Sequence, residues 1–182
     1  MKAEKLGAGI FTIENFLSAT ECLDYIALSE SNIYEVATIN AITGPEINTD
    51  IRHNDRVIFD DHTLAKQLYQ RATEFLPAVC DNWWLNGLNE RFRFYRYTDQ
   101  HYFKWHKDGS FIRNSSEESM LTFMIYLNDS FDADHTELPW EKIIPKKGMA
   151  LVFPHKISHR AIKPRNGTKY ILRTDVMYRQ FQ

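Results

Sequence analysis

Three separate segments in the second half of this chain alternate between apolar and polar residues with a period of two. Residues 91–97, 120–127 and 169–176 each place mainly apolar side chains on one face and tyrosine, lysine or arginine on the other. Successive side chains of a strand point to opposite sides, so this period predicts three β-strands. Because all three strands carry polar groups on one face, we expect a sheet that encloses a polar, ligand-sized lumen.

The first half of the chain contains two helix signals. A capping box at residues 18–21 precedes an apolar repeat, so we expect a helix over residues 18–30. Asp61 is a candidate N-cap for a second helix. The apolar stripe of that helix spans residues 64–75, and Pro77 limits its end.

The order of these elements, with helices in the first half and many antiparallel strands in the second, predicts the fold class. We expect a mainly β protein with flanking helices (α+β), in which N-terminal helices buttress a double-stranded β-helix, or jelly-roll, core. Further strands are expected at residues 10–16, 32–41, 54–59, 141–145, 149–153 and 157–163.

Length and composition limit the number of domains and exclude several classes of protein. The 182 residues suit one domain, with a helix-rich support region over 1–90 and the jelly-roll core over 91–182. The 22 Lys and Arg residues against 24 Asp and Glu give a net charge of -2, so nothing favours a nucleic-acid partner. We expect no secretory signal, because the first residues contain no long apolar stretch; no apolar run reaches membrane length, and Cys22 and Cys80 form no CxxC. We therefore expect a cytoplasmic protein with no membrane association, disulfide scaffold or cysteine zinc site.

One group of candidate metal ligands stands in the second half. His106 and Asp108 are two residues apart, so on an extended segment both side chains point the same way and can reach one ion. The third ligand can be His155 or His159. An HxxxH pair on a helix would suit zinc, but Pro154 and the surrounding strand pattern argue against a helix, so we prefer His159 and give His155 a supporting role. Two histidines and one carboxylate form the ligand set of non-haem iron(II) oxygenases.

Several spaced motifs between residues 91 and 178 resemble the prolyl 4-hydroxylase-like branch of the 2-oxoglutarate- and iron(II)-dependent oxygenases. The motifs are residues 94–97, 106–109, 121–128 and 145–153 and the segment from 159 to 169. The resemblance covers about half of the chain. The sequence departs from the family pattern around Asp99-Gln100 and at residues 133–137, in loops where the family holds its substrate.

The resemblance implies a role for each matching residue. His106, Asp108 and His159 match the iron ligands. Lys169 matches the basic residue that pairs with the distal carboxylate of 2-oxoglutarate, and the cosubstrate pocket is matched by Tyr97 and Tyr126.

Arg173 lies four residues after Lys169 on the same predicted strand face. It could replace Lys169 as the carboxylate anchor, because a guanidinium binds a carboxylate in a bidentate manner. It could instead bind an acidic group of the substrate, or pair with Asp175 or another carboxylate of the lumen for structure. We rank Lys169 first as the anchor and Arg173 second.

The resemblance implies a hydroxylating dioxygenase that uses Fe(II), 2-oxoglutarate and O2 and releases succinate and CO2, with ascorbate as a further reductant. Asp108 stands where related halogenases leave room for chloride, which favours hydroxylation. The substrate could be peptidyl proline, a free amino acid or another small molecule. The alternatives are a non-catalytic, cupin-like metal- or ligand-binding sensor and a hydrolytic zinc site. Neither needs a dicarboxylate pocket, so Tyr97, Tyr126 and Lys169 argue against both.

Other aromatic and basic residues are assigned to packing or to the surface. We expect Trp83 and Trp84 in the core and leave Trp105 and Trp140 open between packing and rim. Arg52, His53 and Arg56 could contact substrate, but a solvated charged strand is the preferred interpretation. We expect surface or loop positions for His53, His62, His101 and His135.

Overall fold

The computed structural model describes residues 1–132 and 135–180, which contain two helices and eighteen strands. The helices are α1 (Ala19–Glu30) and α2 (His62–Ala72). The first nine strands are β1 (Lys2–Gly7), β2 (Ile10–Glu14), β3 (Glu35–Val36), β4 (Ile39–Ala41), β5 (Gly44–Glu46), β6 (Arg52–His53), β7 (Asp55–Asp60), β8 (Val79–Cys80) and β9 (Trp83–Leu88). The other nine are β10 (Arg91–Tyr97), β11 (Tyr102–His106), β12 (Ile112–Asn114), β13 (Glu117–Tyr126), β14 (Thr136–Glu137), β15 (Lys142–Ile143), β16 (Ala150–Pro154), β17 (His159–Ala161) and β18 (Lys169–Arg179).

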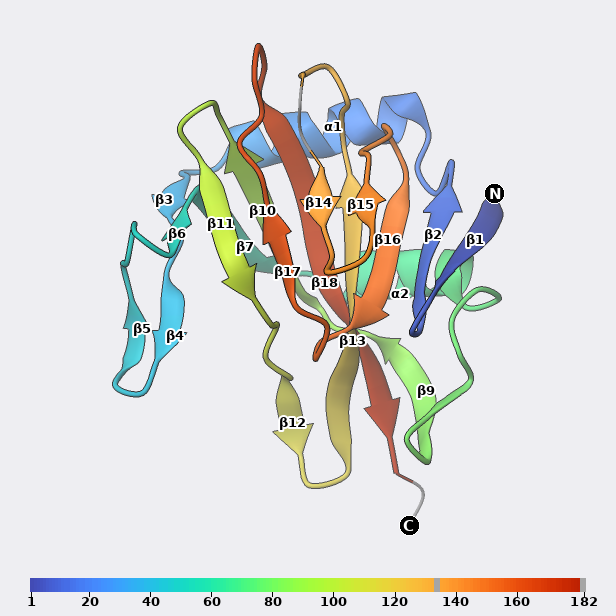
Figure 1. Ribbon diagram of the computed structural model, residues 1–182. Helices are drawn as coiled ribbons and strands as arrows, with labels where there is room; N and C mark the ends of the chain where they lie inside the picture. The colour runs from blue at the N-terminus through green and yellow to red at the C-terminus, as the bar shows by residue number, and fades with distance from the viewer. Residues whose placement is uncertain (133–134, 181–182) are drawn as a thin grey trace.

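The strands form a major sheet of eleven and a minor sheet of five, with β4 and β5 as a separate hairpin. The main path of the major sheet runs β1-β2-β16-β13-β18-β10-β7-β3, and the minor sheet runs β15-β14-β17-β11-β6. In Figure 1 the minor sheet lies in front of the major sheet, and both helices lie behind it. The expected jelly roll buttressed by N-terminal helices is therefore confirmed.

The alternating segments divide their side chains between two cores. Phe92, Phe94 and Leu172 face α2 in a core that also contains Leu64 and Leu68. The opposite face of the same strands contributes Tyr95, Tyr97, Met124, Tyr126 and Ile171 to a second core, which the minor sheet closes through Ile143 and Ala161. The predicted polar face therefore does line the space between the sheets.

Local signals place both helices where the sequence predicts them. The Ser18 hydroxyl accepts from the Glu21 amide at 3.2 Å, and the Glu21 carboxylate accepts from the Ser18 amide at 2.8 Å, which completes the capping box of α1. The Asp61 carboxylate accepts from the Leu64 amide at 2.9 Å and caps α2. The second helix is shorter than its apolar stripe suggests, because it ends at Ala72 and leaves Phe75 in a turn.

Several expectations for the first half are wrong. The first 90 residues contain both helices, but strands β1 to β9 occupy more of them. Trp84 is 50% exposed on β9, whereas Trp83 packs against the core as expected. In the second half, His101 lies in a loop, as expected, and is buried against the ring of His53. Of the divergent segment 133–137, residues 133 and 134 lie outside the described residues.

Across the described ranges, none of the helices has the length and apolar character needed to cross a bilayer.

Gly148 joins the major sheet to the segment that enters α1. Its φ is +78°, and a Cβ built there would lie 2.1 Å from the carbonyl oxygen of Leu17. We therefore expect Gly148→Ala to lower the free energy of unfolding by about 3 kcal/mol, from backbone strain and overpacking together. Chemical denaturation measures the change. Gly7→Ala is the control, because Gly7 has a φ of +87° but open space around its Cβ position. If both variants lose equal stability, the close contact with Leu17 contributes nothing.

Candidate active site

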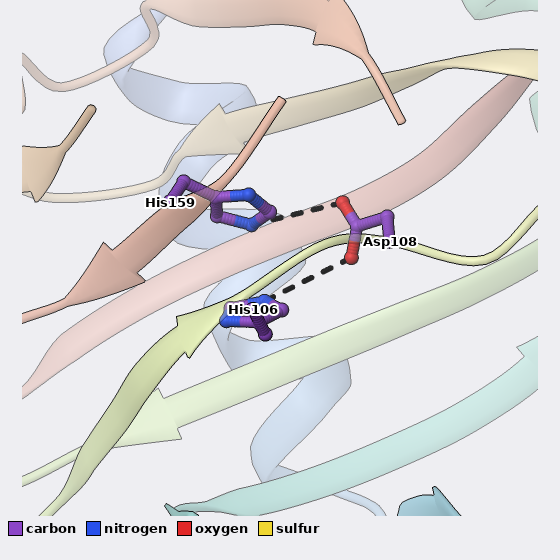
Figure 2. Close-up of side chains that lie close together, drawn as sticks. All are labelled: His106, Asp108 and His159. Carbon is purple, nitrogen blue, oxygen red and sulfur yellow. Dashed lines mark ion pairs between the residues drawn. The ribbon is translucent and has the colours of Figure 1, made fainter. Parts of the chain in front are cut away.

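His106, Asp108 and His159 meet at one point between the two sheets (Figure 2). One ligand atom from each residue lies within 4.8 Å of the others. Oδ1 of Asp108 is 3.9 Å from His106 Nε2, and Oδ2 of Asp108 is 3.7 Å from His159 Nε2. The structure thus brings together the three residues that the sequence singled out, and selects His159 over His155.

Strand register explains why these three side chains meet. His106 is the last residue of β11 and pairs directly with His159, the first residue of β17. Directly opposed residues on antiparallel strands present their side chains to the same face. Asp108 follows two residues after His106, and its amide donates to the carbonyl of His155 at 3.1 Å, which fixes the chain just beyond the strand.

Hydrogen bonds orient both imidazole rings toward the centre of the cluster. Nδ1 of His106 lies 2.8 Å from the carbonyl of Lys104, and Nδ1 of His159 lies 3.1 Å from the carbonyl of Ile157. A carbonyl only accepts, so each Nδ1 carries the proton and each Nε2 presents a lone pair. Burial lowers the pKa of both rings, that of His106 to about 3, so both are neutral near pH 7. Neutral imidazoles with a bonded Nδ1–H are the form that binds metals.

Asp108 is the fixed anion of the cluster. Burial alone would raise the pKa of its carboxyl group, but the positive charge of Arg173 and the Thr122 hydrogen bond hold that pKa well below its usual range. The Thr122 hydroxyl donates to one carboxylate oxygen at 2.5 Å, and Arg173 Nη1 lies 2.8 Å from the other. The carboxylate is therefore ionised and oriented by donors on both oxygens.

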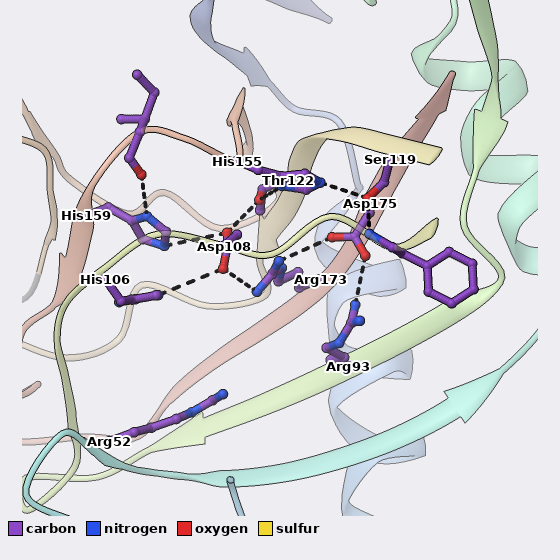
Figure 3. Close-up of polar contacts among 12 residues, drawn as sticks. Arg52, Arg93, His106, Asp108, Ser119, Thr122, His155, His159, Arg173 and Asp175 are labelled. Atoms are coloured by element: carbon purple, nitrogen blue, oxygen red, sulfur yellow. Dashed lines mark hydrogen bonds and ion pairs between the residues drawn. The ribbon is translucent and has the colours of Figure 1, made fainter. Parts of the chain in front are cut away.

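His155 supports Asp108 and lies outside the three-residue cluster (Figure 3). Its Nδ1 lies 2.9 Å from the Thr122 hydroxyl, and its Nε2 lies 2.8 Å from the Ser119 hydroxyl. Since Thr122 donates its hydroxyl proton to Asp108, it accepts from His155. The supporting position expected for His155 is therefore the one that it occupies.

Two cavities meet at the cluster. The inner one is a narrow space of about 30 Å³ that extends into the lumen past Tyr97 and Thr136. The outer one holds about 440 Å³ and opens past Arg52 and Gly109. His106 and Asp108 line both, so any group bound at the cluster can be reached from either side.

Tyr97 on β10 lines the inner cavity, and Lys169 on β18 and Tyr126 on β13 lie on the neighbouring strands. Lys169 is fully buried, and its Nζ lies 4.9 Å from the centroid of the Tyr97 ring, which is its register partner. The Tyr126 hydroxyl lies 2.6 Å from that of Thr136. A buried ammonium beside a tyrosine ring offers the charge and a donor that a carboxylate needs.

Arg173 is engaged by protein carboxylates. Its Nη1 contacts Asp108, and its Nη2 donates to Asp175 at 3.2 Å. Asp175 also accepts from Arg93 at 3.1 Å, so two arginines share this buried carboxylate. Of the roles considered for Arg173, this geometry favours pairing with carboxylates of the lumen.

Arg52 is the site residue that sequence reasoning placed wrongly. It is only 6% exposed, and its guanidinium lies 4.5 Å from the ring centroid of Phe103 and 4.9 Å from that of Tyr95. Both aromatic partners come from other strands, so no local pattern reveals the packing. The sequence favoured a solvated charged strand for Arg52, His53 and Arg56.

Comparison of the sequence with known families finds a match in this region. Residues 92–174 match the family model of the 2OG-Fe(II) oxygenase superfamily. A protein of Acanthamoeba polyphaga mimivirus named as a candidate prolyl 4-hydroxylase is 24% identical over 155 residues. That alignment covers 79% of this chain and 59% of the viral protein, so the chain spans about three fifths of its relative's length.

Solved structures of prolyl hydroxylases share the fold. The viral collagen prolyl hydroxylase of Paramecium bursaria Chlorella virus-1, in complex with 2OG, has a TM-score of 0.69 and 21% identity and covers 94% of this chain and 97% of its own. A Pseudomonas putida prolyl-4-hydroxylase has a TM-score of 0.64, 16% identity and coverages of 96% and 94%. A Trichoplax adhaerens prolyl hydroxylase, in complex with a hypoxia inducible factor peptide, has a TM-score of 0.66, 16% identity and coverages of 93% and 83%. Sequence and fold therefore agree: residues 92–174 match the 2OG-Fe(II) oxygenase superfamily, and the chain as a whole resembles prolyl hydroxylases.

Proposed function

We propose that this chain is a 2-oxoglutarate- and Fe(II)-dependent dioxygenase that hydroxylates an unactivated C–H bond and releases succinate and CO2. The observation that carries the proposal is the convergence of His106, Asp108 and His159 within 4.8 Å at the meeting point of two cavities. Two imidazoles and one carboxylate suit iron(II) and leave coordination positions open for other ligands.

The donor atoms of the cluster fit iron(II). Both Nε2 atoms carry lone pairs, and the carboxylate is ionised without a proton having to leave first. Bound iron would supply the activation of O2 and the oxidation of 2-oxoglutarate and of the substrate C–H bond. The chain would hold the metal with His106, Asp108 and His159, and Thr122 and Arg173 would keep the carboxylate in place.

The inner cavity is our proposed cosubstrate site. Lys169 would pair with the distal carboxylate of 2-oxoglutarate, and Tyr126 and Tyr97 would line the same end. The Lys169 ammonium supports this assignment, because it is fully buried beside the Tyr97 ring and places a fixed positive charge where the distal carboxylate would lie. Arg173, engaged by Asp108 and Asp175, is our second choice as the anchor.

A non-catalytic, cupin-like sensor is the second candidate function, and a hydrolytic zinc site is the third. The three-residue cluster alone would suit either. Lys169 argues against both, because a sensor or a zinc hydrolase has no need of a buried cation in the lumen.

The remaining assignments belong to this proposal. The solved relative with a bound peptide makes a peptide substrate our first choice, with a free amino acid or another small molecule as alternatives. We propose ascorbate as an auxiliary reductant. The two free cysteines, Cys22 and Cys80, are compatible with the reducing cytoplasm as the proposed compartment.

An anaerobic titration tests the proposal directly. Adding Fe(II) and then 2-oxoglutarate to the metal-free protein is expected to produce the weak visible metal-to-ligand charge-transfer band of a chelated 2-oxo acid. Succinate release in a substrate screen would follow. If the metal binds but no band forms, the dioxygenase proposal fails and the sensor takes its place; binding of Zn(II) in preference to Fe(II), with hydrolysis in the absence of O2, would favour the zinc enzyme.

A further inference from the structure

The outer cavity beside the candidate metal cluster has basic walls. Its volume of about 440 Å³ is within the range of small-molecule sites. Five of its lining residues are cationic, and Asp108 is the acidic one among the described lining residues. The five are Arg52, Arg56, Arg93, Lys107 and Arg173.

Arg52 is held in place and still has a free donor. Its Nε donates to Asn54 at 2.8 Å, and its Nη1 donates to the carbonyl of Thr38 at 3.2 Å. Its Nη2 is buried and has no hydrogen-bond partner among the residues that the structure describes. The side chain extends in the direction of Arg93 and Arg173 (Figure 3). A buried guanidinium nitrogen without a partner is costly, so its position indicates a ligand that accepts from it.

Arg56 adds a second cation beside Arg52. Its Nη2 donates to the Thr38 hydroxyl at 3.0 Å. Burial and the positive charges of Arg52 and Arg93 lower the pKa of Arg56, which reflects the crowding of cations at this wall. Within residues 1–132 and 135–180, neither Arg52 nor Arg56 forms an ion pair with a carboxylate; Glu35 is the register partner of Arg56 on the neighbouring strand β3.

Arg93 and Arg173 differ from this pair because their charge is already balanced. Both bind Asp175, and Arg173 also binds Asp108. Lys107 is exposed, so solvent screens its charge. Arg52 and Arg56 together carry two positive charges, which Glu35 offsets by at most one. The positive charge of Arg52 and Arg56 that is left unbalanced suits a monoanion, such as a carboxylate, better than a phosphate dianion.

We propose that the outer cavity binds the substrate through a carboxylate group that Arg52 and Arg56 hold. This inference rests on the proposed function, since it assigns the outer cavity to substrate and the inner one to 2-oxoglutarate. The substrate carboxylate would lie on the Arg52 side of His106 and Asp108. The substrate carbon to be hydroxylated would then lie between this carboxylate and the metal. Arg52 and Arg56 would thereby select acidic substrates.

Binding of matched acid and amide probes tests the proposal. The protein is loaded anaerobically with Fe(II) and N-oxalylglycine, so that the cosubstrate position is filled, and is titrated with N-acetyl-L-proline, N-acetyl-L-alanine and N-acetyl-L-lysine and with the primary amide of each. Calorimetry is expected to show at least one acid binding about tenfold or more tightly than its amide, the difference that a charge-assisted hydrogen bond provides.

Variants assign the preference to the two arginines. Arg52→Met and Arg56→Met are expected to reduce the acid-to-amide ratio toward one; Arg56→Met keeps the test valid if the more buried Arg52 variant fails to fold. Arg91→Met is the matched control, because Arg91 pairs with Asp60 on an exposed part of the same strand as Arg93. The control removes an equal charge and should leave the ratio unchanged.

The outcomes separate this inference from the proposed function. Equal binding of acid and amide, no saturable binding of any acid, or an unchanged ratio in both variants would overturn the inference. If the wild-type protein nevertheless forms the charge-transfer band with Fe(II) and 2-oxoglutarate, the dioxygenase proposal survives that result. If the band is absent, the proposed function itself fails.

Discussion

Replacing Asp108 by alanine is expected to abolish the formation of succinate from 2-oxoglutarate. Asp108 supplies the carboxylate of the cluster, and two neutral imidazoles alone offer iron(II) no charge neutralisation. Removal of a mere hydrogen-bond partner of a metal ligand costs 10- to 100-fold, so loss of a ligand should lower turnover by more than about a hundredfold. Iron stoichiometry under anaerobic conditions and succinate release measure the two effects.

Asp175→Asn separates loss of a ligand from disturbance of Arg173. Asp175 contacts Arg173 as Asp108 does, but it lies outside the cluster of potential ligands. We expect this variant to keep one bound iron per chain, whereas Asp108→Ala loses it. Wild-type succinate formation by Asp108→Ala would rule out this carboxylate as a ligand and with it the proposed iron site.

Replacing Lys169 by methionine is expected to raise the KM for 2-oxoglutarate by about a hundredfold. The ammonium is fully buried at the inner end of the lumen, and loss of a charge-assisted bond there is worth roughly 3 kcal/mol. Methionine has a similar length and no charge, so it limits the cavity that a smaller residue would leave. The KM is measured with iron saturating, and circular dichroism checks that the variant is folded.

Arg173→Met distinguishes the two possible anchors. Because Arg173 contacts Asp108 directly, we expect its loss to weaken iron binding first and to change the KM for 2-oxoglutarate only slightly once iron is saturating. A larger increase in that KM for Arg173→Met than for Lys169→Met would reverse our ranking of the anchors.

The sequence predicted those parts of the site that depend on strand period. Tyr97, Tyr126 and Lys169 face the lumen because each occupies the polar phase of a regular alternation on a central strand. His159 was preferred to His155 for a related reason, since it opens a strand and His155 lies in the turn before it. Local strand geometry is therefore sufficient to predict which side chains face the lumen and which histidine joins the cluster.

Features that depend on distant contacts could not be predicted. Strand β11 was not among the predicted strands, although Phe103 and Trp105 alternate with Tyr102, Lys104 and His106; its pairing with β17 and β6 defines it as a strand. Arg52 looks like a surface residue until Tyr95 and Phe103 enclose it. The link from Thr122 to Asp108 likewise joins segments that share no sequence pattern.

The direct pairing of His106 with His159 has a consequence for the stability of the minor sheet. Its five strands are only two to five residues long, so backbone hydrogen bonds alone hold them weakly. An ion bound by both histidines would cross-link β11 to β17 and fix their register, since a shift of one residue turns a side chain to the opposite face. Iron would then stabilise the minor sheet as well as serve as the reactive centre, and its loss would destabilise the strands that line both cavities.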